Sequence, residues 1–327
     1  MVLFLSRKDI ESFLTIQDTM DVVEEAFKEY GHGTVNMPLR PVIKVGKHGG
    51  TVIFMPALLE GMDALGVKVV SVYPTNPAKY NLPTTIGVVI LNDPKNGSPV
   101  AIMDGSFLTA MRTGGVSGVA TKYLARKDSK EVGIIGTGVQ GRTQVEAVCR
   151  VRSIERVKAY DVVAESCSRF CKEVSQKLGV KTVQARNSEE AVRSSDVVIT
   201  SSSSKEPVLK AEWISPGTHI NAIGSHTPDA REIDASTIKR AKLVVDSREA
   251  ALKEAGDIMM PVAQGLITPD HIFAELGEIV TGKKPGREND DEISLFKSQG
   301  LALQDVSTAW RIFEIATKKG IGKSLAL

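Results

Sequence analysis

Apolar and polar positions follow two different patterns along the chain. In the first third, residues 18–31 carry apolar side chains at helical spacing, which predicts an amphipathic helix. Short runs rich in β-branched residues follow, separated by turn sequences, and they predict the strands of an α+β domain. These runs are residues 38–45, 51–59, 64–74 and 85–93.

From residue 131 onward, short and almost continuous apolar runs alternate with helical segments. Such runs are typical of buried parallel strands, whose crossover connections are helices. The expected strands are residues 131–135, 156–160, 180–184, 196–200, 218–224 and 242–246. The pattern therefore predicts a doubly wound Rossmann sheet in the second half of the chain.

Chain length and two further helical segments define the expected domains. A chain of 327 residues exceeds the usual size of one hydrophobic core, which favours two domains. Residues 106–126 are helical in tendency and lead into the second domain, whereas an amphipathic helix at 303–318 is expected to return to the first. We predict an α/β fold with a Rossmann domain at 127–299 and an α+β domain at 1–126 with 300–327.

Composition narrows the classes of function. The chain has 41 basic and 39 acidic residues, and a net charge of +2 does not favour a nucleic-acid partner. The apolar start is too short for a signal peptide, and no apolar stretch has the length of a membrane span. The three cysteines, Cys149, Cys167 and Cys171, form neither a C-x-x-C pair nor a disulfide framework. These features favour a cytoplasmic enzyme or binding protein without a membrane partner.

A glycine-rich motif follows the first expected Rossmann strand. Its residues are Gly136, Thr137, Gly138, Val139, Gln140 and Gly141, and a helix is expected over residues 140–150. In this context a G-x-G-x-x-G sequence binds a dinucleotide, because the helix N-terminus offers amide donors to the pyrophosphate. A plain glycine-rich turn is the alternative.

Asp161 bears on the choice of cofactor. It follows the second expected strand, about twenty residues after the glycine motif, where a carboxylate accepts bonds from the ribose hydroxyls and repels a 2′-phosphate. This position predicts NAD rather than NADP, and an ordinary turn aspartate is the alternative. Arg142, on the first helical turn, is either a pyrophosphate ligand or a solvated side chain.

Several motifs give the chain its resemblance to a known family. They are residues 37–40, 66–70 with 74–76, 108–113, 136–142, 221–225 with Pro228 and Arg231-Glu232, and 300–305. With these motifs in this order, the chain resembles the ornithine cyclodeaminase and mu-crystallin family, in particular its archaeal-type alanine dehydrogenases. The resemblance implies an NAD-dependent oxidoreductase for small amino or imino acids, and with the β-rich first domain it suggests a homodimer.

The resemblance implies that cationic side chains grip the substrate carboxylate, and the matching residues are Arg40, Lys68 and Arg112. Arginine presents a planar fork to a carboxylate, so these cations suit an anionic amino or keto acid. An outward, ion-paired charge is the alternative for Arg40 and Lys68. Because Lys68 interrupts an apolar run, we expect burial to lower its pKa and let it exchange a proton with the substrate nitrogen.

Two positions depart from the pattern of cyclodeaminases. His226 stands where the resemblance implies an aspartate that assists amine chemistry, and Ile53 stands where it implies a glutamate for the side-chain ammonium of ornithine. Isoleucine cannot hold an ammonium group, which favours a small or apolar substrate side chain. His226 is either an acid/base at the hydride site or a loop histidine bonded to backbone.

Asp305, at the start of the last helix, is a third catalytic candidate beside Lys68 and His226, with a helix N-terminal carboxylate as the alternative. Asp229 is a further carboxylate that a turn explains equally well. The remaining cofactor contacts are expected at Thr113, Ser201, Ile223 and Gly224. The histidines show no spacing that suggests a metal, so no metal is expected.

These residues predict hydride transfer between nicotinamide and the α-carbon of an amino or imino acid. The first interpretation is an L-alanine dehydrogenase, which converts alanine to pyruvate and ammonia. Three alternatives stay open: a reductase of cyclic imines such as pyrroline-2-carboxylate, an ornithine cyclodeaminase, and a non-catalytic binding protein like mu-crystallin.

Overall fold

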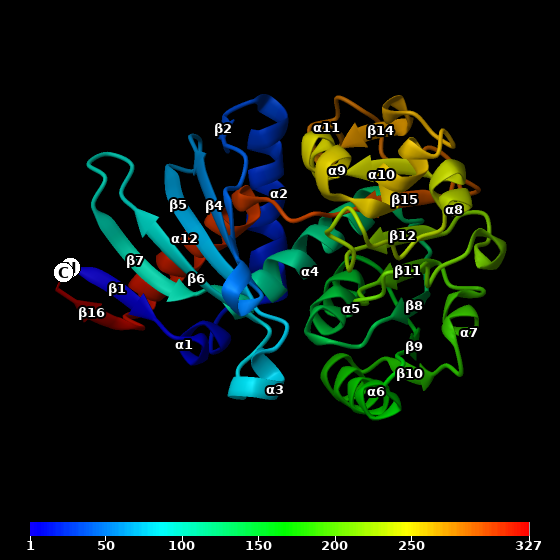
Figure 1. Cartoon of the computed structure of the whole chain (residues 1–327), viewed down its shortest axis with the longest axis horizontal. Helices are drawn as coiled ribbons and strands as arrows, with labels where there is room; N and C mark the ends of the chain where they lie inside the picture. The colour runs from blue at the N-terminus through cyan, green and yellow to red at the C-terminus, as the bar shows by residue number, and fades with distance from the viewer. Residues whose placement is uncertain (327) are drawn as a thin grey trace. The chain divides into compact units, whose positions relative to one another are not determined.

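The computed structural model describes residues 1–326, which form two compact units (Figure 1). Unit 1 comprises Met1–Arg112 and Leu301–Leu327, and unit 2 comprises Thr113–Gly300. The division at residue 112 falls inside helix α4 (Gly105–Leu124), whereas the sequence suggested a boundary just beyond the end of this helix. The segment that begins at Leu301 belongs to the first unit.

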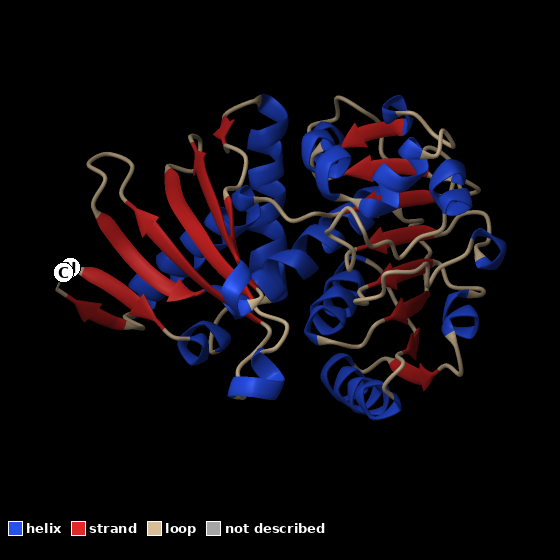
Figure 2. Ribbon diagram, in the orientation of Figure 1, coloured by secondary structure: helices blue, strands red, loops and turns tan. Residues whose placement is uncertain are grey.

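Unit 1 is built on a mixed eight-stranded sheet in the order β16-β1-β7-β6-β5-β4-β2, with β3 paired to β4 (Figure 2). Strands β1 and β7 pair in parallel, and the other strand pairs of this sheet are antiparallel. The strands are β1 (Val2–Leu5), β2 (Val35–Asn36), β3 (Val42–Val45), β4 (Gly50–Leu59), β5 (Ala64–Val72), β6 (Thr85–Asn92), β7 (Pro99–Asp104) and β16 (Lys323–Leu325). The helices are α1 (Arg7–Glu11), α2 (Ile16–His32), η1 (Gly46–His48), α3 (Asn76–Tyr80) and α12 (Ala302–Lys319).

Helix α12 packs against β4, β5 and β6, and α2 packs against α12. Alternate residues of β5, from Ala64 to Val70, are buried, as expected for a strand with one covered face. Lys68 falls in this buried set, opposite Met55 of β4. The strand periodicity therefore turns a lysine inward, beneath helix α12.

Unit 2 is a parallel eight-stranded sheet in the order β10-β9-β8-β11-β12-β15-β13-β14. Its strands are β8 (Glu131–Ile135), β9 (Arg156–Tyr160), β10 (Lys181–Gln184), β11 (Val197–Thr200), β12 (His219–Ala222), β13 (Lys242–Val245), β14 (Ile272–Glu275) and β15 (Ser294–Lys297). Its helices are α5 (Val139–Val151), α6 (Ala164–Leu178), α7 (Ser188–Val192), η2 (Ala211–Trp213), α8 (Ala235–Arg240), α9 (Arg248–Glu254), α10 (Gly256–Ala263), η3 (Pro269–His271) and α11 (Leu276–Val280).

The sheet of unit 2 separates two hydrophobic cores. Ile134 and Ile199 belong to one core, with Phe170 of helix α6, whereas their neighbours Ile135 and Val198 belong to the other, with Ile258 of helix α10. Successive residues of a strand thus supply opposite cores, as helices on both faces require. The predicted α/β class, with a Rossmann sheet and an α+β unit, is confirmed.

The structure contains strands that the sequence pattern did not predict: β1, β2, β7, β14, β15 and β16. Five of them have only two to four residues, and the fourth residue of β15 is the buried Lys297, so periodicity has little to act on. The helices expected over residues 106–126, 140–150 and 303–318 are present as α4, α5 and α12.

Candidate active site

A cavity of about 470 Å³ lies at the carboxyl ends of three neighbouring strands in unit 2. It is lined by residues that follow β8, β9 and β11, including Gly136, Gly138, Asp161 and the serines 201–204. The chain leaves β8 toward β9 on one side and later crosses to β11 on the other, so the strand order reverses here. Open α/β sheets bind ligands at such a switch point.

The glycine motif has the geometry that a dinucleotide requires. Gly136 has a φ of +96°, and a Cβ there would lie 2.6 Å from the carbonyl carbon of Ser201. A Cβ on Gly141 would lie 2.7 Å from the carbonyl oxygen of Gly136, so α5 packs directly on the loop. A Cβ on Gly138 would meet no atom within 4 Å, which leaves open space in front of the helix N-terminus. The loop therefore fits a pyrophosphate.

Asp161 is held at the edge of this cavity. Its Oδ2 accepts hydrogen bonds from the backbone N–H and the hydroxyl of Thr137, at 2.7 and 2.9 Å, and its Oδ1 accepts from the Val163 amide. Burial pushes the pKa of this carboxyl up, but the hydrogen bonds outweigh it and leave the pKa below its ordinary value. An ionised carboxylate at this place is consistent with the predicted ribose contact.

The other predicted cofactor residues surround the same strand ends. Ser201 donates its hydroxyl to the Gly136 carbonyl at 2.8 Å, and Ile223 donates its amide to the Thr200 carbonyl. Gly224 donates its amide to Glu232. Val139 is exposed at the start of α5, and the Oε1 of Gln140 is buried without a hydrogen-bond partner among the described residues.

Two neighbouring residues have structural contacts at the loop. The Thr113 carbonyl accepts a bond from the Gln144 side chain of α5, which places Thr113 beside that helix. Arg142 donates to the carbonyls of Thr137 and Gly138 at 2.7 and 2.9 Å and pairs with Glu173. Its guanidinium therefore stabilises the glycine loop through two backbone carbonyls. The sequence had suggested a pyrophosphate ligand or a solvated side chain, and neither interpretation included this role.

A buried charge cluster lies in unit 1. The Nζ of Lys68 and the Nε of Arg112 both donate to Oδ1 of Asp305, at 2.7 and 2.9 Å. Arg112 also donates to Oε1 of Gln304 at 2.7 Å, and the Thr109 hydroxyl lies 3.4 Å from Lys68. The cluster joins β5, α4 and the first turn of α12, whose members lie up to 237 positions apart in sequence.

The pKa of Lys68 is lowered to about 8. Burial is the main cause, since the side chain is 2% exposed, and the charges of Arg112 and Arg40 add to it, while Asp305 opposes the shift. Arg40 is thus close enough to Lys68 to affect its titration. Lys68 and Arg112 thus lie together on Asp305, and the predicted carboxylate-binding role of these two cations and of Arg40 stays a prediction.

Two atoms of the cluster have no hydrogen-bond partner among the described residues: Oδ2 of Asp305 and Nε2 of Gln304. Burying an unpaired polar atom is unfavourable, so such atoms point to a ligand or to ordered water. One is an acceptor and the other a donor. Sequence reasoning did not single out Gln304 or Thr109, although both lie inside motifs of the family resemblance.

Ile53 lies on the same face of the sheet as Lys68. It pairs with Val70 in the β4–β5 register, and Lys68 pairs with Met55, two residues away. Residues in such diagonal positions are near neighbours. An apolar side chain therefore stands beside the cation cluster.

His226 and Asp229 lie on an exposed loop after β12. The Nδ1 of His226 is 3.0 Å from the Gly224 carbonyl, a local contact within the same loop. Asp229 is exposed and lies 3.8 Å from Lys205. The contacts of His226 match its backbone-bonded alternative, and its predicted acid/base role stays a prediction.

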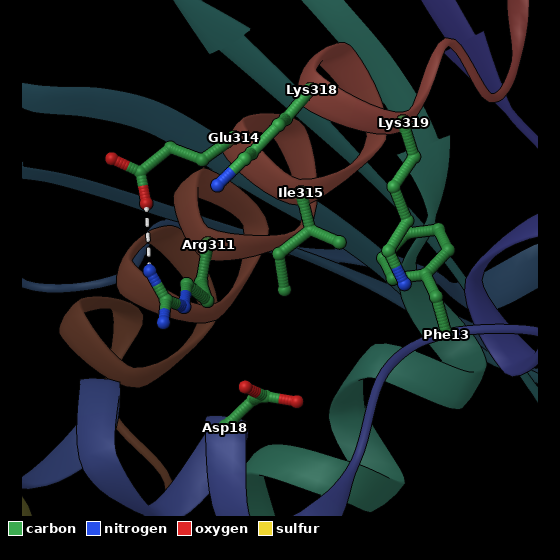
Figure 3. Close-up of a pocket in the computed structure, with 7 residues that line it drawn as sticks. All are labelled: Phe13, Asp18, Arg311, Glu314, Ile315, Lys318 and Lys319. Atoms are coloured by element: carbon green, nitrogen blue, oxygen red, sulfur yellow. Dashed lines mark hydrogen bonds and ion pairs between the residues drawn. The ribbon is translucent and has the colours of Figure 1, made fainter.

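A second cavity, of about 580 Å³, lies in unit 1 between the start of α2 and the last turns of α12 (Figure 3). Arg311 pairs with Glu314 there, Lys319 stacks over the Phe13 ring, and Asp18 caps its own helix. One ion pair therefore lies within this lining, which includes none of the predicted site residues.

Within residues 1–326, no group of three or more His, Cys, Asp or Glu side chains is arranged to hold a metal. The three cysteines are free thiols. No helix in this range is long and apolar enough to cross a membrane.

The fold and the cavity define a Rossmann-type dinucleotide-binding protein with a separate cationic cluster. The model of the ornithine cyclodeaminase/mu-crystallin family matches residues 2–320, and the chain belongs to this family. The resemblance inferred from the motifs is confirmed.

Relatives match over the full length. Alanine dehydrogenase of Archaeoglobus fulgidus is 42% identical over 99% of this chain and 98% of its own. The solved Δ1-pyrroline-2-carboxylate reductase of Thermococcus litoralis, in complex with NADH and L-proline, is 50% identical, with a TM-score of 0.96 over 99% and 100% of the two chains. A dimeric archaeal alanine dehydrogenase with bound NAD is 40% identical, with a TM-score of 0.94 over 100% and 99%.

Proposed function

We propose that the chain is an NAD-dependent oxidoreductase of small 2-amino and 2-imino acids. The observation that carries the proposal is the buried cluster in unit 1, in which one carboxylate, Asp305, faces the two cations Lys68 and Arg112. A buried excess of positive charge is unfavourable unless an anion joins it. A substrate carboxylate supplies that anion, and it suits the fork of an arginine.

The cluster also suits the substrate nitrogen. The unpaired Oδ2 of Asp305 accepts an N–H bond from an amine or iminium, while the unpaired Nε2 of Gln304 donates to a carboxylate oxygen. Both substrate groups then find partners in one place. The glycine loop and Asp161 would hold the cofactor, which supplies or accepts the hydride at the α-carbon.

Lys68 is the proposed proton mover. In the reductive direction its ammonium gives a proton to the substrate nitrogen as the α-carbon gains the hydride, and Lys68 becomes a neutral amine. In the oxidative direction the neutral amine takes a proton from the substrate ammonium. A pKa of about 8 lets Lys68 serve in both directions near neutral pH.

The finer proposal concerns the substrate. The 50% identity to the Thermococcus reductase supports a cyclic imine, Δ1-pyrroline-2-carboxylate, as the preferred substrate. The 42% identity to the Archaeoglobus dehydrogenase supports alanine and pyruvate as the second pair, which the sequence alone ranked first. The apolar Ile53 suits both substrates, since neither carries a side-chain charge.

A single assay series tests the proposal. NADH oxidation is followed with Δ1-pyrroline-2-carboxylate, with pyruvate plus ammonia, and without substrate. We expect turnover with at least one substrate, and reductive kcat/KM should fall as pH rises through about 8, because Lys68 loses its proton. Lys68→Arg, which stays charged, should lose this dependence together with most activity. No NADH oxidation with either substrate would refute the proposal.

Ornithine with catalytic NAD is the test of the lyase alternative. We expect no proline, because the apolar Ile53 beside the cation cluster offers no partner to the distal ammonium. Proline formation without net NADH accumulation would instead identify a cyclodeaminase.

We also propose a cytoplasmic homodimer. The support is the dimer described for the archaeal alanine dehydrogenase, which matches this chain over its full length. Sedimentation equilibrium tests the dimer, and a monomer at micromolar concentration would contradict it.

A further inference from the structure

A second buried charge cluster lies in unit 2. Glu232, Asp257 and Lys297 are each 0% exposed. They come from three separate segments: the chain before α8, the start of α10 and the end of β15. The proposed chemistry uses none of these side chains.

Glu232 joins the ends of two adjacent strands. Its Oε1 accepts the Ser202 amide, two residues after β11, at 2.6 Å, and its Oε2 accepts the Gly224 amide, two residues after β12, at 2.7 Å. Both carboxylate oxygens are therefore used, and both bind backbone of loops at the carboxyl edge of the sheet. The serine loop that includes Ser202 lines the cavity described above.

Glu232 itself is rigidly held. Its amide and that of Ile233 donate to Oδ1 of Asp257, at 2.7 and 2.9 Å, and its carbonyl accepts the amides of Val208 and Leu209. Lys297 lies 2.9 Å from Oδ2 of Asp257 and donates to the Ser225 carbonyl. Burial raises the pKa of Glu232, and the nearby charge of Lys297 opposes that shift. The ammonium thus favours the ionised form of this carboxyl against the effect of burial.

The junction leaves no spare room. A Cβ on Gly224 would lie 2.1 Å from the Ser202 carbonyl oxygen and 2.6 Å from Cδ of Glu232. The two loops thus touch through backbone, with the Glu232 carboxylate beside them. In a doubly wound sheet, the strands on this side of the switch point belong to the half that receives the second mononucleotide.

We infer that Glu232 is a positioning residue for the nicotinamide half of the dinucleotide, because it fixes the loops after β11 and β12 against each other. The adenosine half depends instead on the loops after β8 and β9, where Asp161 lies. This inference rests on the proposed NAD dependence, and it separates the two halves of one cofactor site.

The test compares two probes, NADH and ADP, by fluorescence and calorimetric titration of the full chain. In Glu232→Gln, one loop amide faces the side-chain NH2 group and loses its acceptor. We expect the Kd of NADH to rise about 10- to 100-fold, the scale of a lost charge-assisted bond. The Kd of ADP should stay within about twofold, because the loops after β8 and β9 are untouched.

Asp196→Asn is the matched control. Asp196 also accepts two backbone amides, from Lys130 and Glu131, but at the amino ends of the strands. We expect it to lower the melting temperature without separating the two Kd values. Glu232→Asp provides a second route if Glu232→Gln does not fold: it keeps the charge, but a side chain one methylene shorter cannot reach both loop amides, so it should repeat the selective loss of NADH affinity.

The outcomes separate the two proposals. Failure of the wild-type chain to bind NADH would refute the proposed function itself. Normal NADH binding by the wild type with unchanged affinity in Glu232→Gln, or with equal losses for NADH and ADP, would overturn the inference and leave Glu232 as a brace of the fold.

Discussion

The two units each bury a lysine in a cluster with carboxylates, but the clusters are balanced in opposite ways. Around Lys68, two cations, Lys68 and Arg112, share the single carboxylate of Asp305, one of whose oxygens has no hydrogen-bond partner among the described residues. Around Lys297, two carboxylates share one ammonium, and backbone amides satisfy three of their four oxygens.

This difference distinguishes a ligand site from a scaffold. A cluster with excess charge and unpaired atoms is costly by itself and is completed by a ligand. A cluster whose groups bind backbone amides instead holds segments of the chain in place. Removing one of its members leaves another member as a buried charge without a partner. We therefore expect substrate turnover to depend on the first cluster, whereas stability and the positions of the cofactor loops depend on the second.

The largest effect is expected from removing each lysine in turn. Lys68→Met should lower kcat/KM by about 10²- to 10⁴-fold, the scale of a lost general acid. Its free energy of unfolding at pH 7 should not fall, because Asp305 keeps its bond to Arg112. Lys297→Met should lower the free energy of unfolding by about 3–5 kcal/mol, since Asp257 is left as a buried, uncompensated charge.

Steady-state kinetics and urea unfolding of both variants make this comparison. His226→Gln serves as the kinetic control and should stay within about tenfold of wild type, far less than the loss of a general acid. An active Lys68→Met variant, or a His226→Gln variant as impaired as Lys68→Met, would reassign the proton transfer.

A smaller effect is expected from Arg40. Arg40→Ala should raise KM for the best substrate by about 10- to 100-fold, because one charge-assisted contact to the carboxylate is lost. The exposed Arg7, also in unit 1 and paired with Glu11, is the matched control. Equal kinetics for Arg40→Ala and Arg7→Ala would show that Arg40 does not contact the substrate.

Asp161→Ser extends the comparison to the cofactor cavity. Removing the carboxylate should narrow the preference for NADH over NADPH by about tenfold, since the repulsion of a 2′-phosphate disappears. Dissociation constants for both cofactors measure the change. A wild-type preference for NADPH would contradict the assignment.

A pH-dependent effect on stability is expected from a buried histidine of unit 2. Burial, with the charges of Arg287 and Arg152, lowers the pKa of His219 to about 3, although a hydrogen bond with Asn221 opposes the shift. The unfolded chain binds a proton at this residue below about pH 6.5 and the folded chain does not, so this contribution to stability is lost as pH falls.

Between pH 7 and pH 5 the loss should be about 2 kcal/mol. Urea unfolding of wild type and His219→Asn at both values measures it, and the variant should show the smaller decrease. Equal decreases would mean that other groups dominate the acid sensitivity. The titration of His219 would then contribute nothing measurable to the pH dependence of stability.

The glycine loop, the strands around it and Asp161 were predictable from the sequence because each depends on neighbouring residues. A turn that needs a positive φ at Gly136, and a helix that packs on it at Gly141, leave a local signature. Strands β8 to β13 were predicted as well, and the central strands β8 and β11 show the almost continuous apolar runs that are typical of buried parallel strands. By contrast, the short strand β15 ends in a lysine, and its identity as a strand depends on neighbours far away in sequence.

Residue types and motifs named Lys68, Arg112 and Asp305 as candidates, but the sequence did not show that one oxygen of Asp305 binds both cations. That contact depends on the packing of α12 against β5, which brings together residues 237 positions apart. The role of Glu232 is likewise a tertiary fact, because its two amide partners lie 30 and 8 positions away on separate loops. Local spacing determines where the chain turns and which faces are apolar, whereas folding determines which buried charges are balanced and which await a ligand.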